Sequence, residues 1–583
     1  MDLLRPLERL ATSAKERLGE ARFYHGLLGL LVLAGFLPLL IPGIPQGHDL
    51  YYHFSRLEAM VSGLRHGVFP VLINADALGG YGYASGLFYP DFLLYPVALL
   101  ALSGVGTVVA YKVLLVAVGL ASAYSAQYAV WRIGGSRFGG FAAGILYAWS
   151  SYFAVDVLIR AAVGEFTAFP FLPWIFLGLY EIIHGNPRRL LPLAFGFTGL
   201  VLTHNLSLLI MAVVTALMLA FHAAPLLRAP HRVVWVAAAA VLTVALGAFY
   251  LAPLAEQLTT TRFIVSSIAK SDIAVRAVPL TRLFLELPYM KMEHWIPSGI
   301  GVIMMLVLFQ RCRLTSRGTA PERYRDAMLV GGVVALLAAT NFLPWEGMFR
   351  ALAVLQFPWR SYLPATAFLA LGGGLTLAAL TAGDPARERR WLGILLVGCG
   401  AAWWLNTGYI YAAKMHEGNM FRRFEPGAKQ EASGLCYLPV GSDPFLFQAR
   451  GDAVLATPAL AVEVRRPRHG VLEVPFRGNA SGATLELPLF YYRGYQARLA
   501  TADGQSRVLP VRPSAQHLAA VVLPDDVPAG TVTVRYRGTG LRRLAAWLSL
   551  ATLAALAAAT AWRRRRRRRR PATVARPAAA SAS

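Results

Sequence analysis

Apolar segments close to 20 residues long recur along this 583-residue chain between positions 24 and 562. A helix rises about 1.5 Å per residue, so a run of this length crosses the ~30 Å hydrocarbon core of a lipid bilayer. Hydrophobic residues make up 56% of the chain and charged residues only 15%, which departs from the composition of soluble globular proteins. We therefore expect an integral membrane protein; a soluble enzyme, a disordered scaffold and a collagen-like chain are excluded.

The spacing of the apolar segments predicts about twelve membrane-spanning helices. Their approximate positions are 24–42, 107–130, 138–155, 168–183, 190–204, 206–226, 233–253, 298–310, 326–341, 361–381, 391–412 and 544–562. The first segment lies too far from the start for a cleavable signal peptide, and no small-residue cleavage site follows it, so we expect a retained helix. The predicted fold class is an all-α polytopic membrane protein with a C-terminal β-rich domain.

Basic residues orient the predicted helices. The net charge is +25, but eight arginines form one run at 563–570 and most other basic residues flank apolar segments. This pattern is typical of membrane topology, in which cytoplasmic loops are rich in Lys and Arg, and not of nucleic-acid binding. Both termini are therefore predicted to be cytoplasmic. The apolar stretch 88–102 is predicted not to cross, because counting it would place most arginine clusters outside.

The composition changes near 413, where short alternating stretches separated by Gly, Pro, Asp and Asn begin and predict strands. The predicted division is a cytoplasmic tail at 1–23, a helical transmembrane domain at 24–412 with a long first outer loop at 43–106, an extracytoplasmic β-sandwich-like domain at 413–540, a final transmembrane helix at 541–562 and an arginine-rich cytoplasmic tail at 563–583. The cysteines fall at Cys312 inside, Cys399 in a span and Cys436 outside. No intrachain disulfide is therefore expected in the oxidising compartment.

The first outer loop opens with the sequence GHDLYYHFSRLE. If a helix begins near Asp49, then Asp49, His53 and Arg56 are four and three residues apart and share one face. Two potentially cationic neighbours favour an ionised carboxylate, which suits Asp49 to act as a base or a ligand. The alternative is an N-capping Asp on an interfacial helix, with His53 and Arg56 facing lipid headgroups.

Two further polar clusters lie at predicted outer boundaries. Asp156 and Arg160 form an i, i+4 pair after the third span, and Glu165 follows at the start of the next. They either neutralise one another at the membrane edge or orient a polar substrate. His204 and Asn205 interrupt a long apolar stretch, where they either form a hairpin turn or contact a substrate.

The sequence LQFPWRSYLP places Gln356 and Arg360 at the outer end of a predicted span. An Arg beside an interfacial Trp is often an anchor, but its planar fork also binds a phosphate with two hydrogen bonds. The predicted outer loop at 254–297 is unusually basic and contains Lys291. A phosphate-binding loop would explain that excess, and so would the tolerance of longer loops for charge.

These features together resemble the GT-C superfamily of glycosyltransferases that use polyprenyl-phosphate sugars. The resemblance consists of an acidic residue in a long first outer loop, an interfacial helix with FYP, a charged cluster after the third span and an outer β-domain. GHDLYYHFSRLE, RAAVGEFTA, LTHNLS and QFPWR are similar to bacterial membrane proteins labelled pyruvoyl-tetrahydropterin synthase-related and to YfhO-type proteins of lipoteichoic acid glycosylation. YYRGYQA at 491–497 and ADG at 502–504 are similar to the β-domain of the YfhO-type proteins. The pterin label implies little, because that enzyme needs clustered histidines for zinc and the 12 His here are scattered.

The resemblance implies an inverting sugar transfer at the outer face of the bacterial cytoplasmic membrane. Asp49 then serves as general base with Glu165 as a second catalytic carboxylate, and Arg360, Arg160 and Lys291 stabilise the leaving polyprenyl phosphate. The remaining candidates for substrate contact are His48, His53, Arg56, Asp156, His204, Asn205 and Gln356. The implied partners are membrane lipid, a polyprenyl-phosphate-linked sugar and an envelope glycan, lipid or protein acceptor, with no nucleic acid.

No cofactor is required by this interpretation. A divalent metal is not favoured, because metal-dependent members have further acidic ligands where Leu50 and Tyr51 follow Asp49 here, although Glu165 offers a second carboxylate. A transporter or flippase of envelope lipids is the alternative, but it should show internal repeats and charges near the bilayer midplane. A non-catalytic assembly protein with a polysaccharide-binding β-domain fits the same sequence.

Overall fold

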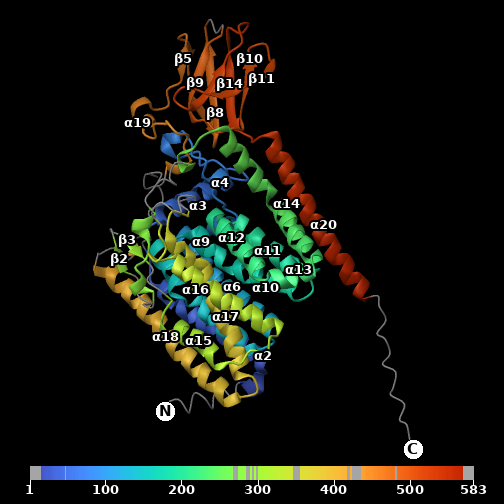
Figure 1. The fold of residues 1–583 in the computed structure, drawn as a ribbon. Helices are drawn as coiled ribbons and strands as arrows, with labels where there is room; N and C mark the ends of the chain where they lie inside the picture. Colours follow the sequence, from blue (N-terminus) through green and yellow to red (C-terminus); the bar gives the residue numbers. More distant parts are fainter. Residues whose placement is uncertain are drawn as a thin grey trace, which may run out of the picture.

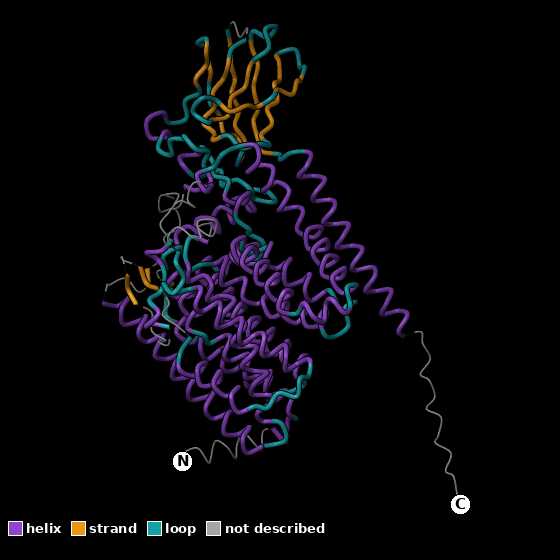
Figure 2. The backbone as a smooth tube through the Cα atoms, viewed as in Figure 1, coloured by secondary structure: helices purple, strands orange, loops and turns teal. Residues whose placement is uncertain are grey.

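The computed structural model describes residues 15–568 except for 46, 267–272, 284–288, 292–293, 297–299, 346–354, 417–420, 423–434 and 479–481. The chain is mostly helical, and most of its strands gather in one region near the C-terminus. Figure 1 shows that region at one end of a helical bundle, with α14 and α20 running along one side of the bundle. The tube in Figure 2 shows the same separation of strands from helices.

The helices of the bundle centre on α6, α7 and α17. Their bounds are α2 Glu20–Gly35, α6 Thr107–Gly134, α7 Arg137–Ala148, α8 Ser151–Val155, α9 Val163–Ala168, α10 Leu172–Ile183, α11 Leu191–Val201, α12 Asn205–Phe221, α13 Ala223–Arg228, α14 His231–Thr260, α15 Val302–Phe309, α16 Ala320–Ala338, α17 Tyr362–Thr381 and α18 Pro385–His416. Helix α17 is almost entirely buried. Small residues allow this: a Cβ at Gly374 would lie 2.6 Å from the Gly139 carbonyl oxygen and from the Ala143 Cβ, so α7 and α17 approach at backbone distance.

Six helical segments among the described residues are long and apolar enough to cross a membrane, and not the twelve that the sequence predicts. They are Thr107–Gly134, Arg137–Arg160, Val163–Ile183, His231–Thr260, Pro358–Thr381 and Gly540–Arg566. The predicted spans at 24–42, 190–204, 206–226 and 298–310 contain helices of 16, 11, 17 and 8 residues.

Two features explain why an apolar run is not always one long helix. The His204 side chain accepts a hydrogen bond from the Ser207 N–H and begins α12, which separates it from α11. Helix α16 has 19 residues, but its first two turns carry Glu322, Arg323, Arg325 and Asp326, and four charges are costly in a lipid-facing helix. Apolar patterning thus marked shorter apolar helices as well as those long enough to cross a membrane.

The segment after α2 folds into short helices against the β-domain end of the bundle. These are α3 Leu50–Arg65, α4 Ser85–Phe88 and α5 Leu94–Leu100. The apolar helix that includes α5 ends at Val105 and is too short to be a spanning candidate, which agrees with the predicted non-crossing stretch at 88–102. Helices α3 and α5 pack on each other.

The predicted β-rich segment forms two antiparallel sheets with one shared core. The sheet of order β11-β10-β14-β8-β6, with β7 paired to β8, faces the sheet of order β12-β13-β9-β5. The strands are β5 Leu455–Thr457, β6 Ala461–Val462, β7 Arg465–Arg468, β8 Val471–Arg477, β9 Thr484–Phe490, β10 Tyr495–Thr501, β11 Ser506–Leu509, β12 Val511–Pro513, β13 Leu518–Val522 and β14 Ala529–Tyr536. Alternate residues of β8, such as Leu472, Val474 and Phe476, are buried, as expected for strands with one wet face.

The β-domain is attached to the bundle through α14 and through the segment after α3. The Gln257 side chain, near the end of α14, donates to the Arg493 carbonyl oxygen at 2.7 Å and accepts from the Arg493 N–H at 3.2 Å. Phe490 and Leu518 share a buried cluster with Tyr81. Helix α20 Gly540–Arg568 then leaves the β-domain and packs along α14.

Candidate functional site

Two backbone hydrogen bonds fix the start of α3 against the end of the segment 137–160. The His48 N–H donates to the Ile159 carbonyl oxygen at 3.0 Å, and the Asp49 N–H donates to the Arg160 carbonyl oxygen at 2.8 Å. The approach needs a glycine, because a Cβ at Gly47 would lie 2.4 Å from the Ala161 Cβ. Main-chain atoms therefore hold together residues that are 111 positions apart in the sequence, independently of their side chains.

Asp49 occupies the N-cap position of α3, but its side chain makes no capping hydrogen bond. The alternative prediction of a structural cap therefore lacks its defining contact. Burial nevertheless raises the pKa of Asp49, while the charges of Arg160 and Arg360 lower it. The residue is exposed, so solvent reaches Asp49 although the charges of Arg160 and Arg360 act on its carboxylate.

Arg160 is the centre of a buried group of charges. Its Nη1 donates to Asp156 Oδ1 at 2.5 Å, to Glu165 Oε2 at 2.9 Å and to the Tyr152 hydroxyl at 3.3 Å. The Tyr152 hydroxyl donates in turn to Glu165 Oε1. All four side chains are at least nine-tenths buried. These side chains therefore form one connected network of hydrogen bonds and ion pairs.

The backbone that carries this network is irregular. Asp156–Arg160 forms a single π-helical turn, and Ala161 after it has a φ of 49°, in the left-handed region. The Ala162 N–H returns to the Asp156 carbonyl oxygen at 3.0 Å. Single π-turns and left-handed non-glycine residues are concentrated at functional sites, since each costs free energy that regular helix would not.

Arg360 reaches the same network from the start of the segment 358–381. Its Nε lies 3.6 Å from Glu165 Oε2, and its Nη1 donates to the Leu355 carbonyl oxygen at 2.8 Å and to Gln356 Oε1 at 2.9 Å. Gln356 has a φ of 64°. The role of Gln356 is therefore to orient Arg360. We refer to Asp49, Asp156, Arg160, Glu165 and Arg360 as the charged cluster.

Each arginine of the charged cluster has a terminal nitrogen that makes no hydrogen bond to any described residue. Arg160 is 6% exposed and Arg360 8% exposed. Among the described residues, neither Nη2 atom takes part in a hydrogen bond, although the Nη1 atoms make several. A guanidinium that is buried, charged and only partly satisfied is suited to bind an anion.

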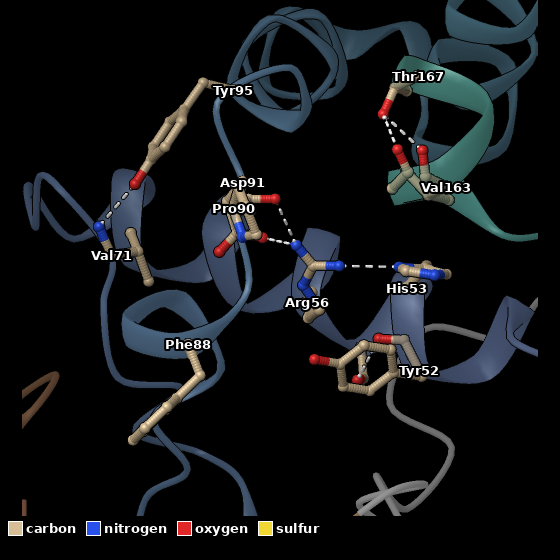
Figure 3. Close-up of polar contacts among 12 residues, drawn as sticks. Tyr52, His53, Arg56, Val71, Phe88, Pro90, Asp91, Tyr95, Val163 and Thr167 are labelled. Atoms are coloured by element: carbon tan, nitrogen blue, oxygen red, sulfur yellow. Dashed lines mark hydrogen bonds and ion pairs between the residues drawn. The ribbon is translucent and has the colours of Figure 1, made fainter. Parts of the chain in front are cut away.

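His53 and Arg56 are buried and therefore do not face lipid headgroups; Figure 3 shows that the two side chains point toward each other. Arg56 Nη1 donates to His53 Nδ1 at 2.8 Å, while its Nη2 forms an ion pair with Asp91 and donates to the Pro90 carbonyl oxygen at 3.0 Å. Because an arginine only donates, His53 Nδ1 must accept. Burial and the charge of Arg56 hold the pKa of His53 well below its usual value. His53 is therefore neutral, and the predicted pair of cationic neighbours of Asp49 is wrong.

His204 and Asn205 have structural partners. His204 begins α12, as described above. Asn205 Nδ2 donates to the Phe88 carbonyl oxygen at 3.0 Å and to the Tyr250 hydroxyl at 2.8 Å, so it fastens the FYP sequence to α12 and α14. These contacts match the turn-forming alternative. Lys291 lies in the short strand β2 Tyr289–Lys291, and its side chain is outside the described residues.

Sequence reasoning missed Tyr152 and Tyr89. Tyr152 precedes Arg160 by eight residues and carries no motif that would single it out. The ring of Tyr89 lies under the Arg56 guanidinium, with 4.1 Å from Cζ to the ring centroid, and a Cβ at Gly164 would lie 2.2 Å from the Tyr89 hydroxyl oxygen. Tyr89 therefore connects α3 to the segment that carries Glu165.

The described residues contain no group of three or more His, Cys, Asp or Glu side chains arranged to hold a metal ion. Both Glu165 oxygens already accept hydrogen bonds, from Tyr152 and Arg160, so Glu165 is not a free second ligand beside Asp49.

No family model matches the chain, and no curated protein sequence matches it.

Proposed function

We propose that this chain is an integral membrane glycosyltransferase that moves a sugar from a polyprenyl-phosphate donor to a cell-envelope acceptor. One observation carries the proposal: a solvent-reached carboxylate, Asp49, lies beside two buried arginines whose Nη2 atoms are unpaired among the described residues. A base next to two anion-binding forks is what inverting transfer from a sugar phosphate requires. The six long apolar helices support the membrane setting.

The proposed reaction needs one proton transfer and one displacement. Asp49 takes the proton of an acceptor hydroxyl as that oxygen attacks the anomeric carbon. The bond between this carbon and the phosphate oxygen breaks, its electron pair stays on the phosphate, and the sugar is transferred with inversion. Arg160 and Arg360 stabilise the leaving phosphate, whose charge grows as the bond breaks. Glu165 holds both guanidinium groups and is a positioning residue here, not a second base.

The place of the charged cluster favours an enzyme over a transporter. Arg160 ends the segment 137–160, Glu165 begins the segment 163–183, and Arg360 begins the segment 358–381. All three thus lie at helix ends on the side of the bundle that meets α3 and the β-domain. Transporter sites are typically near the midplane of the spanning helices. In our proposal this end of the bundle faces the outside of the cytoplasmic membrane, and both termini are cytoplasmic.

The test is sugar transfer by the purified full chain in liposomes. A radiolabelled polyprenyl-phosphate sugar is supplied with cell-envelope acceptors, and the anomeric configuration of the product is compared with that of the donor. We expect an inverted product. Transfer with retained configuration would contradict the role of Asp49, and movement of intact donor across the liposome membrane without any transfer would support the transporter instead.

A further inference from the structure

A pocket lies where three segments that are distant in the sequence meet, and it shares no residue with the charged cluster. Its volume is about 330 Å³. The lining comes from the loop after α3, from the β-domain and from the first turn of α20: Val68, Phe69, Pro70, Leu72, Gln496, Tyr536, Arg537, Arg542 and Arg543.

The charge of this pocket is entirely positive. Three of its lining residues are arginines and none is acidic. Within the described part of the chain, Arg537, Arg542 and Arg543 form no ion pair. The nearby carboxylate of Glu256 is already bound, by Arg493 at 3.1 Å and by the Thr539 hydroxyl at 2.6 Å. The pocket therefore holds about three uncompensated positive charges, which favour an anionic ligand.

One wall of the pocket is apolar and firmly held. Phe69 is 74% exposed, and its ring meets the edge of Tyr95 with 5.4 Å between centroids. The Tyr95 hydroxyl accepts a hydrogen bond from the Val71 N–H at 2.9 Å, as Figure 3 shows. An exposed Phe beside three arginines suits a ligand with an apolar part and an anionic part.

The pocket also lies at the level where the apolar surface of α20 begins. Leu541, Leu544 and Trp547 are 47%, 68% and 71% exposed, and they follow Arg537 directly in the chain. Tryptophan is typical of the boundary between headgroups and hydrocarbon. A lipid whose chains lie along α20 would therefore bring its headgroup to the three arginines.

We infer that this pocket binds the phosphate of an anionic membrane lipid, with Arg537, Arg542 and Arg543 around the headgroup and Phe69 against its glycerol and upper chains. Charge-assisted hydrogen bonds from guanidinium groups to phosphate oxygens supply the specificity. The bound lipid fills the joint between α20, the β-domain and the loop after α3. The inference rests on the proposed membrane location but not on sugar transfer.

The test measures which lipid the purified full chain retains. Protein is exchanged into detergent with equal amounts of phosphatidylglycerol and phosphatidylcholine, and bound lipid is counted by native mass spectrometry. The wild type should prefer phosphatidylglycerol. A variant with Arg537→Gln, Arg542→Gln and Arg543→Gln should lose roughly a hundredfold in this preference, given about fivefold for each arginine near an anionic headgroup.

The matched control removes three arginines from exposed positions elsewhere on the β-domain, with Arg477→Gln, Arg498→Gln and Arg512→Gln. Equal loss of preference in this control would overturn the site, because net charge alone would then explain it. If the triple pocket variant unfolds, Arg543→Gln alone, at an exposed position, should still give a partial loss.

A further measurement with inorganic phosphate distinguishes a lipid ligand from a free anion. The lipid assignment would be overturned if the wild type shows no lipid preference and inorganic phosphate protects it, but not the pocket variant, against thermal unfolding. No donor sugar is present in these measurements. Failure of sugar transfer therefore leaves this inference standing, whereas a chain that stays soluble without detergent would remove the membrane basis of both.

Discussion

Replacing Asp49 by Asn tests the proposed base while leaving the fold alone. The two side chains have nearly the same size, and Asp49 makes no capping hydrogen bond through its side chain. The usual loss of about 0.5–2 kcal/mol for removing a helix cap therefore does not apply. The contact that does hold this residue, from its N–H to the Arg160 carbonyl oxygen, belongs to the backbone and survives the change.

The expected loss in rate follows from removing one proton acceptor. A positioned general base contributes about 10²- to 10⁴-fold, or about 3–5 kcal/mol of activation free energy. Arg160 and Arg360 remain in place, so binding of the donor phosphate should persist. The loss should therefore appear in kcat, with little change in the KM for the donor.

The assay is transfer from a radiolabelled polyprenyl-phosphate sugar, with thermal unfolding measured on the same preparations. Asp76→Asn is the matched control, because Asp76 lies in the same loop and is exposed. Wild-type turnover by Asp49→Asn would refute the role of the base. If the variant loses activity and its melting temperature also falls far below that of the wild type, Asp49 has a structural role instead.

The pH profile, the buried ion pairs and the topology give three further predictions. Burial raises the pKa of Asp49, and the base acts only when ionised, so activity should decline on the acid side at a pH above the pKa of a free aspartate. Arg360→Gln removes a charge that lowers the pKa of Asp49 and should therefore move this decline to higher pH. A shift of the measured profile to lower pH would contradict this prediction. Glu165→Ala leaves two buried guanidinium groups without their shared carboxylate and should lower the free energy of unfolding by about 3–5 kcal/mol; denaturant titration checks this, and a loss below 1 kcal/mol would show that the network is not cohesive. In a cysteine-free background, an impermeant reagent added to intact cells should label Arg498→Cys in the β-domain and not Arg188→Cys at the far end of the bundle; labelling of Arg188→Cys alone would invert the topology.

The long helices and the β-rich region were predictable because each has a local signal. Apolar length marks 107–134 and 231–260, and alternation with Gly and Asn turns marks β8 to β10. The number of long apolar helices was not predictable in this way, since apolar patterning does not distinguish one long helix from shorter apolar helices. The cap at His204 and the charges at the start of α16 are two features of this kind.

The charged cluster shows the same division between local and distant information. Asp156, Arg160 and Glu165 lie within ten residues of one another, so their association could be expected from spacing. Asp49 and Arg360 arrive from elsewhere in the chain, and the resemblance to known motifs, not any spacing, suggested that they belong together. The contact of Gly47 with Ala161 that brings Asp49 into place has no signature in the sequence.

The pairing of α20 with α14 has a consequence for the order in which the protein is assembled. Ser549 on α20 donates to the Ala245 carbonyl oxygen, across 304 residues of sequence, so α14 must wait for nearly the whole chain to be synthesised before it meets this neighbour. In the proposed membrane setting, lipid chains cover this face of α14 until then, and because they are as apolar as the helix, they give it little tendency to aggregate. Helices α6, α7 and α17 can therefore assemble while the ribosome is still at work, and the β-domain docks last, onto a bundle that is already built.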